Sequence, residues 1–252
     1  SCNVYFYQVG LRLGDQLINK YAFMLGLGDL TGIDLPGEKT GWLSGEEAYN
    51  KRFARRGWKW TTGLVLDLAI GQTQIVTPIQ LALMVGGVTN GKALYKPYLV
   101  KEERTSSGAV VNQRFPEVKS VLNLKESSVT TIREALGNVV RPGGTGSRAA
   151  VPGITVGGKT GSAENPQGDK THALVVACAP VENPVIAVAV VVENGGGGGA
   201  VAGPIAGDIM RYFFAETTDG IRIVQELAVD SVNVRKLNAS VSKYTEILAG
   251  QQ

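Results

Sequence analysis

The sequence predicts an α+β fold, in which helical segments come first, an antiparallel sheet follows and one more helix completes the pattern. Three observations predict it. Apolar residues recur at helical spacing in several segments of the first 140 residues. Three strand-like runs then fall between residues 151 and 193. Helical spacing returns from residue 201 to residue 214.

Length and composition agree with one large folded domain or two small ones, either of which can bury a core. The chain has 252 residues, of which 44% are apolar, and its formal net charge of +3 comes from 25 basic and 22 acidic side chains. These values exclude intrinsic disorder, and so balanced a charge gives no case for nucleic-acid binding. Two cysteines exclude a disulfide scaffold and a four-cysteine zinc site. We expect neither a metal nor an organic cofactor.

Nothing in the sequence indicates a membrane span or a leader peptide. The most apolar run, Val185 to Val192, is long enough for a buried strand but far short of the roughly 20 residues that cross a bilayer. The chain opens at Ser1, without an initiator methionine or a signal peptide. We therefore interpret it as a mature, trimmed or truncated product.

Capping signals support the helical candidates. Thr77 suits an N-cap and Pro78 the first helical position, and Asn90-Gly91 ends that segment. A glycine, Gly26, also follows the first candidate. The segments with helical spacing are Val4–Leu25, the run from Thr77 to Asn90, Ser127–Val140 and Val201–Phe214.

The strand candidates come in a row. They lie around Thr155 to Lys159, from Ala173 to Ala179 and from Val185 to Val192, and residues 180–184 make a plausible hairpin turn. A polar stretch from Arg104 to Gln113 predicts a separate hairpin tip, with Ser-Ser-Gly at its turn. We expect residues 1–215 to form the folded portion and residues 216–252 a tail of uncertain structure.

Two short motifs match parts of the set S-x-x-K, S-x-N and K-T-G that serine acyl transferases use. Ser1-Cys2-Asn3 supplies an S-x-N, and Lys159-Thr160-Gly161 a K-T-G. A hydroxyl and an amide on one loop can relay a proton and hold a substrate amide. A lysine on an edge strand brings positive charge to the nucleophile and to a substrate carboxylate.

Further copies of these motifs have the wrong context. A second K-T-G begins at Lys39 in a turn rich in proline and glycine, where we expect a structural loop. The single S-x-x-K, at Ser240, lies in the polar tail after the K-T-G copies, and a second S-x-N begins at Ser231. We interpret these copies as chance matches.

Seven blocks in order resemble the transpeptidase domain of class B penicillin-binding proteins, in particular the penicillin-binding protein 2 group of rod-shape elongation. The resemblance covers about residues 1 to 215 and implies the fold of penicillin-binding proteins and serine β-lactamases, incomplete at the N-terminus. The blocks are SCNVYFYQVG, GIDLPGE, IGQTQIVTPIQLA, RPGGTGSRA, GGKTGSAE, HALVVACAPVENP and VVVENGGGGGAVAGPIA.

The resemblance also implies a missing element. In this family the nucleophilic serine and its lysine lie in an S-x-x-K motif upstream of S-x-N, and this sequence begins at S-x-N. We therefore expect residues 1–252 alone to be inactive, and the missing segment to leave an apolar cleft.

The family assigns roles to five residues of this sequence, and the size of a sixth, Gly161, suits the same site. Ser1 would relay a proton, Asn3 would contact the substrate amide and Lys159 would tune the electrostatics of the serine centre. Thr160 and Ser162 would hold the carboxylate of the donor peptide or of a β-lactam, and Ser162 would give half of the oxyanion hole through its backbone N–H. The small Gly161 lets a substrate backbone lie close to the strand.

Four other features are interpreted as structural. Cys2 fills the variable position of S-x-N, and we expect a buried thiol there. His172, the single histidine, is expected at a strand edge without a catalytic role. The spacing of Glu164 and Glu193 supports no carboxylate pair, and the glycine run 195–199 predicts a flexible turn.

The predicted function is that of a peptidoglycan D,D-transpeptidase that cross-links stem peptides through a serine acyl-enzyme and binds β-lactams. The alternative is a non-catalytic scaffold or sensor module with the same fold. The resemblance implies the periplasmic face of the bacterial inner membrane, with the anchor outside this chain. Its implied partners are a membrane glycan polymerase and the scaffold proteins of cell elongation.

Overall fold

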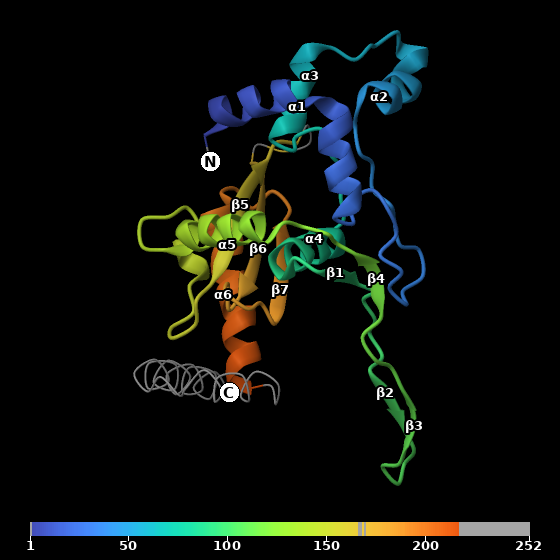
Figure 1. Cartoon of the computed structure of the whole chain (residues 1–252), viewed down its shortest axis with the longest axis vertical. Coiled ribbons are helices and arrows are strands. Elements are labelled where there is room, and N and C mark those ends of the chain that lie inside the picture. The colour runs from blue at the N-terminus through green and yellow to red at the C-terminus, as the bar shows by residue number, and fades with distance from the viewer. Residues whose placement is uncertain (1, 166–167, 169, 217–252) are drawn as a thin grey trace. The chain divides into compact units, whose positions relative to one another are not determined.

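The computed structural model describes residues 2–165, 168 and 170–216, and it divides into two compact units (Figure 1). The first unit comprises Ser1–Gly87 and Gly91–Asn123, and the second comprises Val88–Asn90 and Leu124–Gln252. Helices combined with antiparallel strands confirm the α+β class. The expected tail, apart from its first residue, lies outside the described residues.

Helix α1 (Asn3–Met24) confirms the first helical candidate, but it is bent in the middle (Figure 1). Gly14 has φ 72° and ψ 168°, a conformation that glycine adopts far more readily than other residues. Before the bend, a Cβ at Gly10 would lie only 2.4 Å from the Cβ of Ala69. Gly10 thus allows close packing of α1 on α3 (Thr62–Ala69).

Helix α2 (Glu46–Phe53) and the 3-10 turn η1 (Ala54–Arg56) precede α3, and the sequence patterns did not predict these three elements. A distant side chain holds the start of α2, because the Asp15 carboxylate accepts a hydrogen bond of 2.8 Å from the backbone N–H of Glu46. Local capping patterns contain no signal for such a contact.

Helix α4 (Pro78–Asn90) confirms the second candidate and its predicted caps. Thr77 accepts a hydrogen bond from the backbone N–H of Gln80, and the Gln80 side chain accepts one from the backbone N–H of Thr77. Gly91 ends the helix in the left-handed conformation, with φ 73°.

The first unit also contains two small antiparallel pairs. β1 (Ala93–Tyr95) pairs with β4 (Val118–Val121), and β2 (Glu102–Arg104) pairs with β3 (Val110–Gln113). The turn between β2 and β3 lies at residues 106–108, so the hairpin predicted there is confirmed. The β1–β4 pair was not predicted.

The second unit is built on a three-stranded antiparallel sheet in the order β5–β6–β7. β6 (His172–Ala179) and β7 (Ile186–Val192) match their predicted runs. β5 (Gly157–Ala163) begins two residues later and ends four residues later than predicted. It begins later because the carbonyl oxygen of Thr155 accepts from the N–H of Val181 in the turn after β6, outside the ladder. It ends later because its pairing with β6 continues to Ala163, opposite His172.

Two helices pack on this sheet. α5 (Glu126–Val140) contacts β5, and α6 (Gly198–Glu216) contacts β6 and β7 and the 3-10 turn η2 (Ser147–Ala149). Four side chains of α6 at four-residue spacing are at most 1% exposed: Ala202, Ala206, Met210 and Phe214. They share a core with alternate residues of β6, namely Ala173, Val175, Ala177 and Ala179.

Candidate active site

The S-x-N element lies in the first unit, at the start of α1. Ser1 is outside the described residues, and Asn3 is the exposed first residue of the helix. Cys2 occupies the N-cap and is exposed, so the expected burial of its thiol is wrong. The reason is local, because the neighbouring side chains of the first turn are also exposed, including Val4 and Tyr5.

The K-T-G element lies in the second unit, in the middle of β5. Lys159 is opposite Val176 in the ladder, and the next two residues of the motif follow the same register. Within the described residues β5 pairs with β6 alone, so it is an outer strand of its sheet. An outer strand can pair with an extended peptide through its second edge.

Thr160 and Ser162 occupy alternate positions on β5 and contact two other segments. The Thr160 hydroxyl donates a hydrogen bond of 3.1 Å to the hydroxyl of Thr145, in the loop between α5 and η2. The Ser162 hydroxyl accepts a hydrogen bond of 3.3 Å from the backbone N–H of Gly198. Three hydroxyl groups therefore gather where α6 begins.

The start of α6 needs two glycines of the run 195–199. A Cβ at Gly198 would lie 2.2 Å from the carbonyl oxygen of Gly161, and a Cβ at Gly199 would lie 2.0 Å from that of Thr145. The prediction of a flexible turn over the whole run is therefore wrong, because its last two glycines form the start of α6. They allow its positive N-terminal end to lie against β5.

Lys159 has an exposed side chain, yet neighbouring atoms remove part of its hydration. This desolvation lowers the pKa of its ammonium group from the usual 10.5. The Nζ atom donates a hydrogen bond of 2.6 Å to the carbonyl oxygen of Thr160. The cation is therefore held near the backbone of β5.

Two other nucleophile or base candidates of the second unit have structural environments. His172 accepts a hydrogen bond at Nδ1 from the backbone N–H of Asn194 at 3.0 Å, at the first position of β6. Cys178 is fully buried, and burial raises the pKa of its thiol to about 11.

The second K-T-G is part of a structural loop, as predicted. The carbonyl oxygen of Thr40 accepts from the Nε2 group of the fully buried Gln80 at 2.8 Å. A Cβ at Gly41, which has φ 70°, would lie 2.2 Å from the carbonyl oxygen of Ile75. Lys39 is exposed on this loop.

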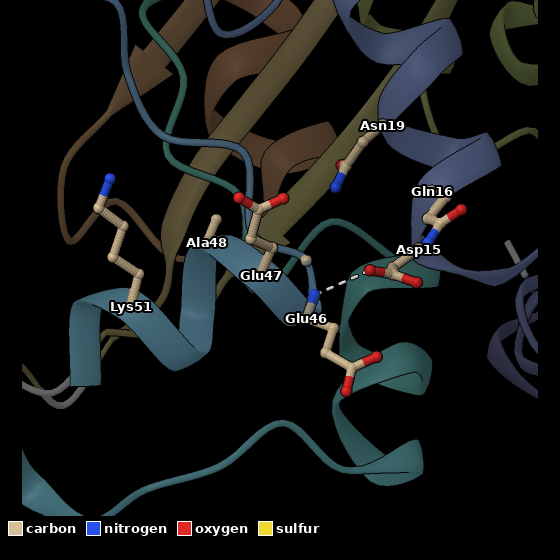
Figure 2. Close-up of a pocket in the computed structure, with 8 residues that line it drawn as sticks. Asp15, Gln16, Asn19, Glu46, Glu47, Ala48 and Lys51 are labelled. Carbon is tan, nitrogen blue, oxygen red and sulfur yellow. Dashed lines mark hydrogen bonds between the residues drawn. The ribbon is translucent and has the colours of Figure 1, made fainter. Parts of the chain in front are cut away.

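A polar pocket of about 600 Å³ lies in the first unit, between the second half of α1 and the start of α2 (Figure 2). Asp15 and Asn19 line it from α1, and Glu46, Glu47 and Lys51 from α2. Both residues of α1 bond the backbone near the start of α2. The Asn19 amide group donates to the carbonyl oxygen of Ser44 at 2.7 Å, and the Asp15 carboxylate accepts from the N–H of Glu46 at 2.8 Å. Among the described residues no cluster of acidic, histidine or cysteine side chains could hold a metal ion.

Most of the chain matches a known protein family. Residues 1–211 match the penicillin binding protein transpeptidase domain. The chain belongs to this family. Among curated proteins it is 39% identical over 224 residues to stage V sporulation protein D of Bacillus subtilis, covering 84% of this chain and 32% of that protein. It is 30% identical over 209 residues to the peptidoglycan D,D-transpeptidase MrdA of Acinetobacter baumannii, covering 77% and 30% respectively.

Solved penicillin-binding protein 2 structures have the same fold. The structure of the Pseudomonas aeruginosa protein in complex with WCK 5153 aligns with a TM-score of 0.69 and 31% identity, over 86% of this chain and 48% of that one. The complex of the Helicobacter pylori protein with MreC aligns with a TM-score of 0.67 and 28% identity, over 84% and 38%. These matches confirm the resemblance to class B penicillin-binding proteins and the fold it implied. The chain spans about a third of the length of the curated relatives.

The sequence motifs found β5 but missed its surroundings. Thr145 and the first turn of α6 were not among the predicted site residues, although both lie in blocks that carried the family resemblance. In the described ranges, none of the helices combines the length and apolar character that a bilayer-spanning segment needs.

Proposed function

We propose that this penicillin-binding protein domain is part of a peptidoglycan D,D-transpeptidase, which cross-links stem peptides through a serine acyl-enzyme and is acylated by β-lactams. The observation that carries the proposal is a group of three hydroxyls, two on β5 and one on the loop beside it. Thr160, Ser162 and Thr145 converge where α6 begins, and Lys159 adds a cation on the same strand.

This chemistry suits a peptide that ends in a carboxylate. Hydroxyl groups donate to carboxylate oxygens, and both the ammonium group and the positive helix end attract the anion. The outer edge of β5 offers backbone groups to an extended donor peptide. Ser1 and Asn3 take the proton-relay and amide-contact roles in the proposal, and the N–H of Ser162 serves the oxyanion hole.

The acylated serine belongs, in this proposal, to an S-x-x-K element outside residues 1–252. The single S-x-x-K within them begins at Ser240 and follows K-T-G in the chain. Acyl transfer needs a serine that an adjacent general base activates. In the family pattern the S-x-x-K that supplies both groups precedes S-x-N and K-T-G, whereas the copy at Ser240 follows them.

Relatives support the proposed partners. The Acinetobacter relative is a peptidoglycan D,D-transpeptidase, and the Helicobacter penicillin-binding protein 2 was solved in complex with MreC. We infer that this chain acts at the periplasmic face of the inner membrane, anchored by sequence outside it, with an elongation scaffold and a glycan polymerase.

Labelling with a fluorescent penicillin tests the function. The protein that carries this chain together with its upstream sequence should be labelled stoichiometrically, whereas residues 1–252 alone should not. Lys159→Ala should slow labelling at least tenfold with little change in melting temperature, and Lys39→Ala, in the second K-T-G, should leave the rate unchanged. An unlabelled longer protein would support the non-catalytic scaffold instead. Labelling of residues 1–252 at Ser240 would contradict the placement of the nucleophile.

A further inference from the structure

One short segment of the first unit carries a local excess of positive charge. Residues 48–66 contain no acidic side chain, whereas the net charge of all 252 residues is +3. The five basic residues of the segment exceed that net value, so the rest of the chain is net negative. They are Lys51, Arg52, Arg55, Arg56 and Lys59.

These five side chains are displayed to solvent. They lie on α2, on η1 and on the loop that follows, and each is exposed. Within the described ranges none of them forms an ion pair. Closely spaced like charges repel one another, and this cost is recovered when an anionic partner binds.

The same segment contains most of an aromatic cluster. The three tryptophans of the chain, Trp42, Trp58 and Trp60, take part with Tyr49 and Phe53. The ring centre of Tyr49 lies 4.6 Å from that of Phe53, with the rings tilted, and 5.6 Å from that of Trp60, in an edge-to-face arrangement. Trp58 lies 5.3 Å from Phe53 and keeps 51% of its surface exposed.

Arginines lie over these rings. The guanidinium carbon of Arg52 is 4.5 Å from the centre of the Trp42 ring, and that of Arg56 is 5.3 Å from the centre of the Trp58 ring. Stacking of this kind limits the motion of a long side chain while its N–H groups stay available to carboxylates. We name residues 51–60 together with Trp42 the basic-aromatic surface.

We propose that the basic-aromatic surface is a docking site for the anionic glycan polymer of the cell wall, made of different residues from the acyl-transfer site. The inference rests on the proposed function, which supplies peptidoglycan as the polymer that the protein meets. Its stem peptides carry free carboxylates, which suit these exposed arginines and lysines. Its sugar rings have apolar faces, which can pack on the exposed ring of Trp58.

A lipid surface fits these observations less well. Interfacial helices insert a broad apolar face, but α2 has only eight residues and its aromatic side chains contact other rings. Trp58 is the single large apolar side chain of residues 48–66 that is exposed. One exposed ring with an arginine over it, in a segment of basic residues, matches a polymer of sugars and carboxylates better than a bilayer.

Cosedimentation with purified insoluble peptidoglycan tests the proposal. The full protein is first treated with penicillin, so that binding at the acyl-transfer site does not contribute. Arg55→Gln with Lys59→Gln removes two exposed charges that form no ion pair among the described residues, and should weaken binding about tenfold. Lys101→Gln with Lys125→Gln, two exposed lysines elsewhere, changes the net charge equally and should leave binding unchanged. Trp58→Ala should also weaken binding, with the melting temperature as its folding control.

Further binding experiments distinguish a peptidoglycan site from a lipid site. Blocking the carboxylates of the peptidoglycan as amides should reduce binding to the level of the double variant, and added salt should do the same. Equal binding by the double variant and the Lys101/Lys125 control would overturn the proposal. The proposal would also be overturned if the protein bound phosphatidylglycerol vesicles more strongly than peptidoglycan and the double variant lost that binding to vesicles. Penicillin labelling should be the same in all variants. Because labelling tests the transpeptidase assignment and cosedimentation tests the docking site, failure of one proposal can be distinguished from failure of the other.

Discussion

Arg148 donates a hydrogen bond of 3.3 Å from its guanidinium group to the carbonyl oxygen of Ala200 in α6. Ala200 lies four residues before Pro204, which sits inside the helix. Because proline has no N–H, the carbonyl oxygen of Ala200 lacks the usual helical donor. The arginine of η2 supplies one instead, and it joins the loop of Thr145 to the helix that begins beside β5.

We predict that Arg148→Ala lowers the free energy of unfolding by about 1 kcal/mol, because a carbonyl group then loses its donor. Pro204→Ala restores a backbone donor to the same oxygen. In that background Arg148→Ala should cost less than half as much, which a double-mutant cycle from urea unfolding would measure. Equal costs in both backgrounds would mean that Arg148 does not act through Ala200.

The contact between α6 and β5 predicts a sharp difference between neighbouring glycines. Gly198→Ala places a methyl group 2.2 Å from the carbonyl oxygen of Gly161, so the helix must shift away from the strand. We expect a loss of about 3 kcal/mol of stability and strongly reduced penicillin labelling of the longer protein.

Gly197→Ala is the matched control for this prediction. A Cβ there would meet only the Cβ of Ala200, at 3.9 Å, so stability should change by less than about 0.5 kcal/mol. Thermal unfolding compares the two variants. A Gly198→Ala protein that melts like the Gly197→Ala protein would contradict the close packing of α6 on β5.

Local signals in the sequence explain why some elements were predictable. The helix that begins at Pro78 has its N-cap, its proline and its closing glycine within the segment itself. The strand β6 alternates buried and half-buried residues over most of its length, which local hydrophobicity indicates well. In both cases the information lies within a few residues of the element.

Other features depend on residues that are distant in the sequence. The start of α2 is held by Asp15, 31 positions before Glu46, and Gly198 is required by the backbone of Gly161. Cys2 is exposed together with Val4 and Tyr5 on the first turn of α1, and a three-residue motif does not indicate whether other residues cover it. The K-T-G motif and the strand pattern around it located β5, but not the hydroxyl of Thr145 beside it.

Glu38 in the GIDLPGE block should make stability depend on acid pH. Desolvation opposes ionisation of its carboxyl group, but hydrogen bonds from the hydroxyl and N–H of Thr31 and the N–H of Gly32 outweigh it. The pKa of Glu38 is therefore lowered from the usual 4.5. A carboxyl group with a lowered folded-state pKa stabilises the fold above its unfolded value and loses this effect as pH falls.

Glu38→Gln should accordingly destabilise the first unit by about 1 kcal/mol at pH 7. The difference in the free energy of unfolding between the variant and the unmodified protein should shrink as pH falls below about 4.5 and through the lower folded-state pKa of Glu38. Glu103→Gln, at an exposed position on β2, is the control and should show neither effect. A Glu38→Gln deficit that stays constant down to about pH 3 would argue against ionic stabilisation.

Lys159 provides a prediction for the pH dependence of acylation. Desolvation disfavours its charged form, so its ammonium group loses a proton at lower pH than an ordinary lysine, whose pKa is 10.5. If the positive charge assists acylation, the rate of penicillin labelling should fall on the alkaline side at a pH below 10.5. Lys159→Arg keeps a charge at all accessible pH values, because the guanidinium group does not deprotonate there. That variant should lack the alkaline fall even if its rate at pH 7 is lower.

The rates are measured by rapid labelling between about pH 6 and pH 10.5, with melting temperatures recorded at each pH to exclude unfolding. An identical alkaline fall in Lys159→Arg would assign the titration to another group and remove the electrostatic role from Lys159.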